Sequence, residues 1–149
     1  MAIGAAPQSN IIGPDKFREG NEKFSLRVLV ADDSEINRES LKENLEARGY
    51  TVVVVEDGQL LMDKLREENF NLIITDRDMP NKTGLEVIEE ISSSEEFKKI
   101  PVILMTGFPS AMEKNKLESL GVPYLPKPFL IKKLYDLIDE LIQKSESLK

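Results

Sequence analysis

The chain has 149 residues, which suits one domain, and it carries a formal net charge of −7. It contains neither cysteine nor histidine, which excludes disulfides, thiolate metal sites, cysteine nucleophiles and phosphohistidine intermediates and leaves carboxylates, hydroxyls and lysines for any chemistry. The acidic balance disfavours direct binding to nucleic acids or anionic membranes, and without a secretory signal or an apolar run near ~20 residues we expect a cytoplasmic protein.

Residues 1–25 contain glycines and prolines at irregular intervals and show no periodic apolar face. We interpret this segment as an N-terminal extension or linker, with one helical turn over residues 15–19. A single domain is predicted to follow over residues 26–145.

Short runs rich in valine and isoleucine follow, and each is nearly continuous in apolar residues. Such runs are typical of strands that are buried on both faces of a parallel sheet. The predicted strands are residues 27–31, 51–55, 72–75, 102–106 and 122–125.

Between these runs the apolar residues recur with helical spacing. The predicted helices are residues 37–48, 59–68, 84–92 and 110–120, with Gly49 and Gly121 ending the first and the last of these. A further helix is predicted from an apolar stripe formed by Leu130, Leu134, Leu137, Ile138 and Leu141. The alternation predicts an α/β fold with a five-stranded, parallel, doubly wound sheet of the flavodoxin-like type, in the strand order 2-1-3-4-5.

Polar residues stand at the carboxyl ends of the predicted strands, where ligands bind in sheets of this kind. Asp32 and Asp33 follow the first strand, and Asp76 follows the third. Thr106 ends the fourth strand, and Lys127 comes shortly after the fifth. We therefore expect all these side chains at one edge of the sheet.

Clustered carboxylates repel one another unless a cation lies between them, and without histidine or cysteine they suit a hard ion such as Mg²⁺. Asp76 could then attack phosphorus while the metal neutralises charge on the phosphoryl group. Lys127 could pair with Asp76 before the transfer and with a phosphoryl oxygen afterwards. Thr106 could donate its hydroxyl to the same group, and Gly107 leaves room for that group to enter.

Each of these residues also has an ordinary structural explanation. Ser34 or Asp33 can cap the next helix, a threonine that ends a strand is commonly a β-former, and a lysine before proline commonly lies in a solvated loop. Their joint occurrence at successive strand ends, in an order that fits the sheet, favours the functional interpretation.

Residues 26–143 resemble the receiver domain of two-component response regulators. The motifs that carry the resemblance are Asp32-Asp33-Ser34 after an apolar run, Asp76-x-x-Met79-Pro80 with Gly84, Pro101-Val-Ile-Leu-Met-Thr106-Gly107, and Tyr124-Leu-Pro-Lys127-Pro128-Phe129. The Asn37-Arg38 pair is similar to that of receivers fused to hybrid sensor kinases, which suggests a phosphorelay.

The resemblance implies that Asp76 accepts a phosphoryl group from a histidine kinase or a histidine-containing phosphotransfer protein and forms an aspartyl phosphate. It implies Mg²⁺ held by Asp33, Asp76 and the carbonyl of Asp78, with Asp32 acting mostly through water. Such a domain is not an enzyme acting on other substrates, because it catalyses only its own phosphorylation and dephosphorylation.

The resemblance also implies a cis peptide bond between Lys127 and Pro128 and a switch formed by Thr106 and Tyr124. Phosphorylation is expected to draw Thr106 inward and to let Tyr124 turn into the vacated space. The face made by the fourth helix, the fifth strand and the fifth helix would then repack. We expect a downstream protein to bind there, or the domain to form a phosphorylation-dependent homodimer.

Two departures from the family pattern bear on function. Residues 121–127 are one residue shorter than usual and contain Pro123, so a tighter turn could already hold Tyr124 inward. Asp78 and Phe108 stand at positions that flank the hydrolytic water in the family. They are expected to lengthen the lifetime of the phosphoryl group, although Asp78 could instead orient the water as a base.

Two alternative functions account for parts of the same sequence. A phosphatase of the haloacid dehalogenase type would use Asp76-Arg77-Asp78 as its nucleophile motif. In those enzymes the acid pair follows the lysine, whereas here Asp32-Asp33 precede every other site residue. A pseudo-receiver would keep the fold as a binding module without phosphorylation, but such modules usually lose an acid, the threonine or the lysine, and this sequence retains all of them.

Overall fold

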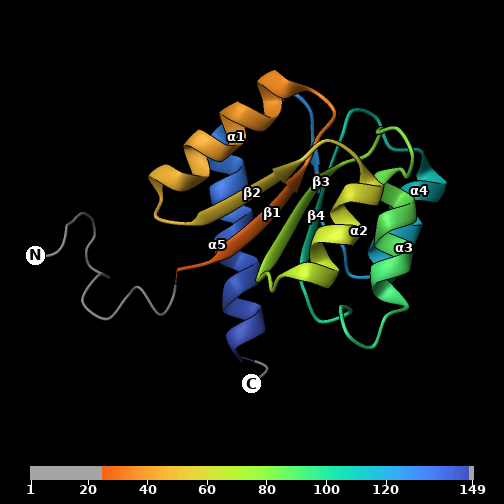
Figure 1. The fold of residues 1–149 in the computed structure, drawn as a ribbon. Helices are drawn as coiled ribbons and strands as arrows, with labels where there is room; N and C mark the ends of the chain where they lie inside the picture. Colours follow the sequence, from red (N-terminus) through yellow and green to blue (C-terminus); the bar gives the residue numbers. More distant parts are fainter. Residues whose placement is uncertain (1–24, 148–149) are drawn as a thin grey trace, which may run out of the picture.

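The computed structural model describes residues 25–147, and their fold is drawn in Figure 1. The helical turn expected over residues 15–19, like nearly all of the predicted extension, lies outside the described residues. The division into an extension over residues 1–25 and a domain over residues 26–145 stays a prediction.

Strands and helices alternate through the described part of the chain. In chain order they are β1 (Arg27–Ala31), α1 (Glu35–Ala47), β2 (Thr51–Val55), α2 (Gly58–Glu67), β3 (Leu72–Asp76), α3 (Gly84–Ser92), β4 (Val102–Thr106), α4 (Ala111–Ser119), β5 (Tyr124–Pro126) and α5 (Ile131–Ser147). The strands pair in parallel in the order β2-β1-β3-β4-β5, which confirms the predicted flavodoxin-like, doubly wound sheet. None of the described helices is both long and apolar enough to cross a membrane.

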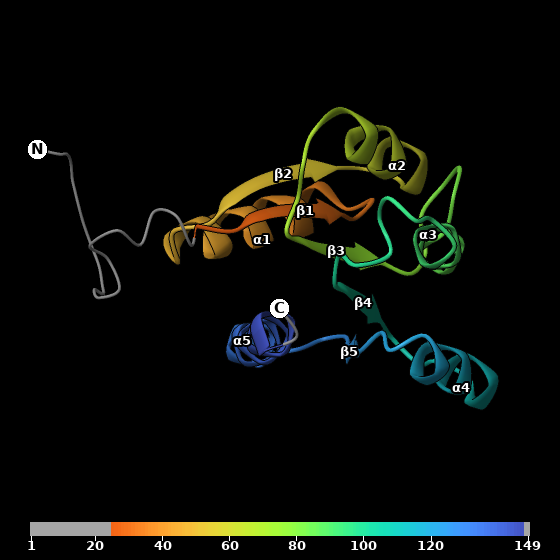
Figure 2. The same cartoon turned by 90° about the horizontal axis from the view of Figure 1, so that it is seen from below.

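The sheet lies between two layers of helices (Figure 2). One face is covered by α1 and α5, and the other by α2, α3 and α4. Leu45 of α1 and Ile138 of α5 belong to the first apolar core, and Met62 of α2 and Ile88 of α3 belong to the second. The central strands β1, β3 and β4 are buried along nearly their whole length, which explains why their apolar residues do not alternate with polar ones.

Local chemistry sets the ends of α1 and α4. α1 begins at Glu35 rather than at the predicted Asn37, because the Ser34 hydroxyl caps the helix by accepting the N–H of Asn37 at 3.3 Å. Gly49 (φ 93°) follows α1 and Gly121 (φ 70°) follows α4, both in the left-handed region that glycine adopts most easily. Both predicted stops are therefore confirmed.

The fifth strand lies further along the chain than predicted. The sequence predicts residues 122–125, whereas β5 is Tyr124–Pro126. Pro123 has no backbone N–H to donate, and its carbonyl oxygen accepts the N–H of Leu104 at 3.1 Å just before β5 begins. The third strand, in turn, extends one residue beyond its prediction and includes Asp76.

The predicted apolar stripe of the last helix is wrong at its first member. Leu130 is 74% exposed and precedes α5, whereas Leu134 and Ile138 are fully buried. The carbonyl oxygen of Leu130 accepts the N–H of Lys133 at 2.9 Å, so this residue leads into the first turn while its side chain stays in solvent.

Replacing Leu134 with alanine should lower the free energy of unfolding by about 2–5 kcal/mol, because it leaves a cavity between α5 and the sheet. The matched control is Leu130→Ala, which should change that free energy by less than about 0.5 kcal/mol because the side chain is exposed. Urea unfolding followed by circular dichroism measures both variants. Equal losses would contradict the packing of Leu134 between α5 and the sheet.

Candidate functional site

The register of the sheet brings the ends of neighbouring strands to one edge. Ala31 pairs with Thr75, Asp76 with Met105, and Thr106 with Pro126. The acid pair that follows β1 therefore lies beside the end of β3, and the end of β4 lies beside the segment that leads into α5.

Asp32, Asp33 and Asp76 form a cluster of carboxylates. One oxygen from each lies within 4.8 Å of the others, and Asp32 and Asp76 are buried while Asp33 is exposed. A set of donors made only of carboxylate oxygens suits a hard divalent cation such as Mg²⁺, which takes few protein ligands and keeps several waters. These residues therefore fit the metal that the family resemblance implies.

Asp32 is held in place by the start of α1. Its Oδ1 accepts the N–H of Ser34 at 2.9 Å, and its Oδ2 accepts a hydrogen bond from Asn37 Nδ2 at 3.4 Å. Its carbonyl oxygen accepts one from Arg38 Nη1 at 2.9 Å. Sequence reasoning missed these contacts of Asn37 and Arg38, because they depend on how the first helical turn faces the strand end. The carboxylate of Asp33, by contrast, makes no hydrogen bond or ion pair with any described residue.

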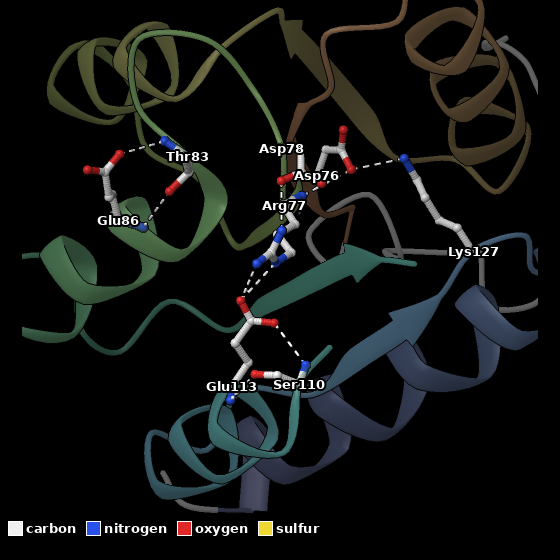
Figure 3. A network of polar contacts seen from close by, with 8 residues as sticks. All are labelled: Asp76, Arg77, Asp78, Thr83, Glu86, Ser110, Glu113 and Lys127. Atoms are coloured by element: carbon white, nitrogen blue, oxygen red, sulfur yellow. Dashed lines mark hydrogen bonds and ion pairs between the residues drawn. The ribbon is translucent and has the colours of Figure 1, made fainter. Parts of the chain in front are cut away.

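The described residues hold the carboxylate of Asp76 through one of its two oxygens. Oδ1 accepts the N–H of Arg77 at 3.0 Å and a hydrogen bond from Lys127 Nζ at 2.9 Å (Figure 3). Oδ2 accepts no hydrogen bond from any described residue. Lys127 Nζ also lies 3.7 Å from Asp32 Oδ2, and the Lys127–Pro128 peptide bond is cis, as the resemblance implies.

Burial and charge shift the pKa values of this pair. Burial raises the pKa of Asp76 above its ordinary value against the opposing hydrogen bond from Lys127, and the negative charge of Asp32 adds to the rise. Burial alone lowers the pKa of Lys127, but the hydrogen bond to Asp76 and the charges of Asp32 and Asp76 outweigh it, so that pKa is raised overall. Lys127 therefore stays protonated at neutral pH.

Thr106 presents a buried hydroxyl that lacks a partner among the residues the structure describes. The residue is 2% exposed, and its hydroxyl makes no hydrogen bond to any described residue, although buried polar groups are normally paired. Its carbonyl oxygen accepts the N–H of Lys127 at 2.8 Å, so the backbone is fixed. Apart from its chain neighbours, no described atom lies within 4 Å of a Cβ added at Gly107, so the position that follows Thr106 is open.

Gly84 allows the start of α3 to lie close behind Asp76. A Cβ at this position would clash with the carbonyl oxygen of Asp76 and lie 3.0 Å from Arg77 Cα. The N–H of Gly84 donates to the carbonyl oxygen of Arg77 at 2.8 Å. The glycine of the second motif is therefore explained by a close approach of two backbone segments.

Three predicted site residues lie outside the carboxylate cluster. The side chain of Asp78 is exposed and pairs with Arg77 at 2.8 Å, Phe108 is 98% exposed, and Tyr124 is half-buried against the core beneath α2, α3 and α4. The metal role of the Asp78 carbonyl, the shielding by Phe108 and the switch role of Tyr124 stay predictions.

Arg77 has contacts that sequence reasoning missed. Its guanidinium pairs with Glu113 of α4 as well as with Asp78 (Figure 3). Arg77 and Glu113 are separated by 36 positions, so no local pattern reveals the pair. The Ser110-x-x-Glu113 spacing is typical of a helix start. It could have placed Glu113 in the first turn of a helix, but it does not reveal the contact with Arg77.

A groove of about 440 Å³ opens beside the acid cluster. Its lining includes Asp32 and Lys127 of the site together with the apolar side chains of Leu41, Met105 and Phe129. The groove therefore runs between α1 and the segment that joins β5 to α5, and it adjoins the carboxylates.

The model of the family described as response regulator receiver domain matches residues 28–139. Among curated relatives, response regulator MprA of Mycobacterium bovis (strain BCG / Pasteur 1173P2) is 31% identical over 124 residues, and response regulator RR06 of Streptococcus pneumoniae serotype 2 is 32% identical over 120 residues. These matches cover 83% and 80% of this chain but 53% and 54% of the relatives. The chain thus spans about half the length of the curated relatives it matches.

Solved structures share the fold. The chemotaxis response regulator CheY4 of Vibrio cholerae matches with a TM-score of 0.72 at 28% identity, over 78% of this chain and 98% of that one. The signal receiver domain of a signal transduction histidine kinase from Syntrophus aciditrophicus matches with a TM-score of 0.74 at 26% identity, over 80% of this chain and 92% of that one.

Asp76→Asn should raise the melting temperature of the metal-free protein at pH 7. The raised pKa of Asp76 means that its ionised form costs the fold stability, and asparagine removes that charge. As the pH falls, the folded parent takes up the proton before the unfolded chain does, so the advantage of the variant should disappear below about pH 4.

Thermal unfolding in EDTA at several pH values measures this effect. Asp78→Asn makes the same chemical change at an exposed carboxylate and should leave the melting temperature nearly unchanged. An Asp76→Asn variant that melts at or below the parent temperature at pH 7 would contradict the electrostatic account of the site.

Proposed function

Because the chain belongs to the response regulator receiver family, whose members are signalling domains of two-component systems, we propose that Asp76 accepts a phosphoryl group. The observation that carries the proposal is a three-part arrangement. Asp76 Oδ2 is free of hydrogen bonds from the described residues, Lys127 is bound to the other oxygen, and the buried hydroxyl of Thr106 has no partner among those residues. The proposed donor is a histidine kinase or a histidine-containing phosphotransfer protein.

Asp33 and Asp76 are proposed as direct ligands of Mg²⁺, with the carbonyl oxygen of Asp78 as a third protein ligand and Asp32 acting through water. Asp33 suits a direct role because its carboxylate has no partner among the described residues, whereas Asp32 already accepts hydrogen bonds from the start of α1. When bound, Mg²⁺ supplies positive charge that offsets both the repulsion among the carboxylates and the charge of the phosphoryl group.

In the proposed transfer, a carboxylate oxygen of Asp76 forms a bond to phosphorus while the bond from phosphorus to the donor's imidazole nitrogen breaks. The electron pair of that bond returns to the imidazole, which leaves as neutral histidine when its other nitrogen carries the proton. Lys127 then pairs with a phosphoryl oxygen, and the Thr106 hydroxyl donates to another. The product is an aspartyl phosphate.

The groove beside α1 supports a protein donor that reaches the site from that side. Its lining joins Asp32 and Lys127 to apolar side chains, and the exposed Ile36 stands next to Asn37, which also lines the groove. A phosphohistidine-bearing helix that packs its apolar side against this groove is the proposed occupant.

Phosphorylation is proposed to act on the face formed by α4, β5 and α5. A hydrogen bond from Thr106 to a charged phosphoryl oxygen is roughly twice as strong as a neutral one, which favours an inward Thr106 and vacates space for Tyr124. The face carries exposed lysines at positions 114, 116, 132 and 133 on a protein of net charge −7. A downstream protein or a second copy of the chain is the proposed partner of this face.

No finding favours the alternative functions, a phosphatase or a pseudo-receiver.

Phe108 and Asp78 are proposed to lengthen the lifetime of the aspartyl phosphate. Asp78 would add negative charge where water must approach, and Phe108 would have to fold over the phosphoryl group, since its ring is exposed in the unmodified protein. The alternative, in which Asp78 orients the water, predicts a shorter lifetime.

Incubation with Mg²⁺ and a small acyl phosphate should add one phosphoryl group to the protein, and Asp76→Asn should abolish the addition because it removes the nucleophile. Intact-protein mass spectrometry measures the change. Asp78→Asn is the matched control and should still be labelled. Undiminished labelling of Asp76→Asn would show that another carboxylate is the acceptor and would overturn the proposal.

Mg²⁺ should raise the melting temperature, because it binds the clustered carboxylates of the folded protein and not the unfolded chain; saturation at 100 times the dissociation constant stabilises by about 2.7 kcal/mol. Asp33→Asn should weaken this effect most. Glu39→Gln removes one exposed acid from α1 outside the cluster and should keep it. Identical melting curves with and without Mg²⁺ would count against the metal site.

A further inference from the structure

Helix α4 has little apolar packing to hold it. Leu117 is its one buried side chain, and the structure describes every residue of this helix. Met112 is largely exposed, as is Phe108 just before the helix. Polar contacts must therefore contribute much of what fixes the position of α4 relative to the sheet.

An ion pair joins the start of α4 to the residue that follows Asp76 (Figure 3). Arg77 Nε donates to Glu113 Oε2 at 3.1 Å, and Arg77 Nη2 donates to the same oxygen. The pair is only partly exposed, 32% at Arg77 and 20% at Glu113, so solvent screens it less than a surface pair.

Glu113 uses its second oxygen to cap the helix. Its Oε1 accepts the N–H of Ser110 at 3.0 Å, while the Ser110 hydroxyl accepts the N–H of Glu113 at 3.1 Å. The Glu113 side chain therefore both caps the first turn of α4 and forms an ion pair with Arg77. Arg77 is therefore in direct contact with the side chain that caps the first turn of α4.

Arg77 is also tied to the carboxylate that precedes it. Its backbone N–H donates to Asp76 Oδ1 at 3.0 Å, the oxygen that Lys127 also contacts. An anionic group on Asp76 changes the charge and the hydrogen bonding of that oxygen, and it offers the guanidinium a competing negative partner. Arg77 thus faces the site with its backbone and α4 with its side chain.

We propose that the Arg77–Glu113 ion pair transmits occupancy of Asp76 to α4, with Arg77 as a positioning residue. The proposal rests on the proposed function for the ligand at Asp76, and it adds a route to α4 that does not pass through Thr106 or Tyr124. The pair holds the start of α4 against Arg77, so a change at Asp76 shifts the helix as long as the pair is intact.

Helix α3 provides a matched comparison within the same chain. Thr83 and Glu86 form the same capping box at its start, with the Glu86 carboxylate accepting the N–H of Thr83 at 2.9 Å (Figure 3). Glu86 makes no ion pair with any described residue. Glu86→Gln and Glu113→Gln are therefore the same substitution at the same helix position, and only the second removes an ion pair.

The test uses the full chain with Mg²⁺ and beryllofluoride, a phosphoryl mimic, and measures amide hydrogen exchange. In the parent, exchange across residues 111–119 should change by about 5-fold or more on addition of the mimic. Glu113→Gln retains an amide oxygen for the cap and should reduce that response to less than about 2-fold, while Glu86→Gln should keep the parent response. Arg77→Gln and Glu113→Gln remove the same ion pair, so each alone should reduce the response equally. The double variant should show no further loss.

A second control separates transmission from simple anchoring. Lys116 of α4 pairs with Glu89 of α3, and both side chains are about half exposed. Lys116→Gln loosens α4 without touching Arg77, so it should speed exchange in the free protein slightly and leave the response to the mimic intact.

The outcomes are distinguishable. A response of α4 that survives in Glu113→Gln as it does in Glu86→Gln, with exchange near Asp33 and Asp76 still changing, would overturn the transmission and leave the proposed function standing. The absence of any change near Asp33 and Asp76 in the parent would contradict the proposed function itself and remove the transmission with it. Loss of the α4 response in Lys116→Gln as well would reduce Arg77 to one anchor among several and also overturn the proposal.

Discussion

Three carboxylates lie within 4.8 Å of one another at the end of a buried sheet, and their negative charges repel one another. The neighbouring residues of this edge are arranged in ways that reduce or withstand this repulsion. Lys127 lies 2.9 Å from Asp76 and 3.7 Å from Asp32, so one ammonium serves two acids. One ammonium does not balance three carboxylates, and burial together with the charge of Asp32 raises the pKa of Asp76 despite the hydrogen bond from Lys127. Among the described residues, none donates to Asp76 Oδ2 and none pairs with the Thr106 hydroxyl, so the same edge combines excess carboxylate charge with an acceptor and a donor that these residues leave open.

The parallel sheet explains why such a costly arrangement stays fixed. Asp76 is the last residue of β3, and the preceding Thr75 pairs with Ala31 of β1, so the backbone of Asp76 cannot move away from Asp32 without disturbing that ladder. Behind it, Gly84 lets α3 approach so closely that a single added carbon would clash with the Asp76 carbonyl. The repulsion is thus held in place by backbone pairing and by packing, and a ligand relieves it more easily than a conformational change does.

The features that follow from local chemistry could be predicted from the sequence, and those that need two distant segments could not. The strand order could be predicted from the alternation of strand-like and helix-like apolar patterns. Ligands bind beyond the carboxyl ends of the strands in such sheets, and this rule predicted that the polar residues at those ends lie together: Asp32, Asp76, Thr106 and Lys127. The prediction that Leu130 belongs to the apolar stripe of the last helix was wrong. Its spacing fits the stripe, but α5 starts one residue later, at Ile131. Contacts such as Arg38 to the Asp32 carbonyl have no local signature, because they depend on side-chain direction across an interface.

The two capping boxes show how one local signal acquires different consequences in the folded chain. Thr83-x-x-Glu86 and Ser110-x-x-Glu113 start α3 and α4 with the same pattern of hydrogen bonds. α3 buries Val87, Ile88 and Ile91 besides Gly84, so its cap merely completes a helix that the core already holds; α4 buries Leu117 alone, and its cap residue also grips Arg77. Because α4 has little apolar packing and is held at its start by an ion pair to Arg77, it can shift at a small cost in free energy. A shift of α3 would disrupt its buried apolar contacts. Of these two helices, α4 is therefore the better placed to report a change at Asp76, because the hydrophobic core holds it less than it holds α3.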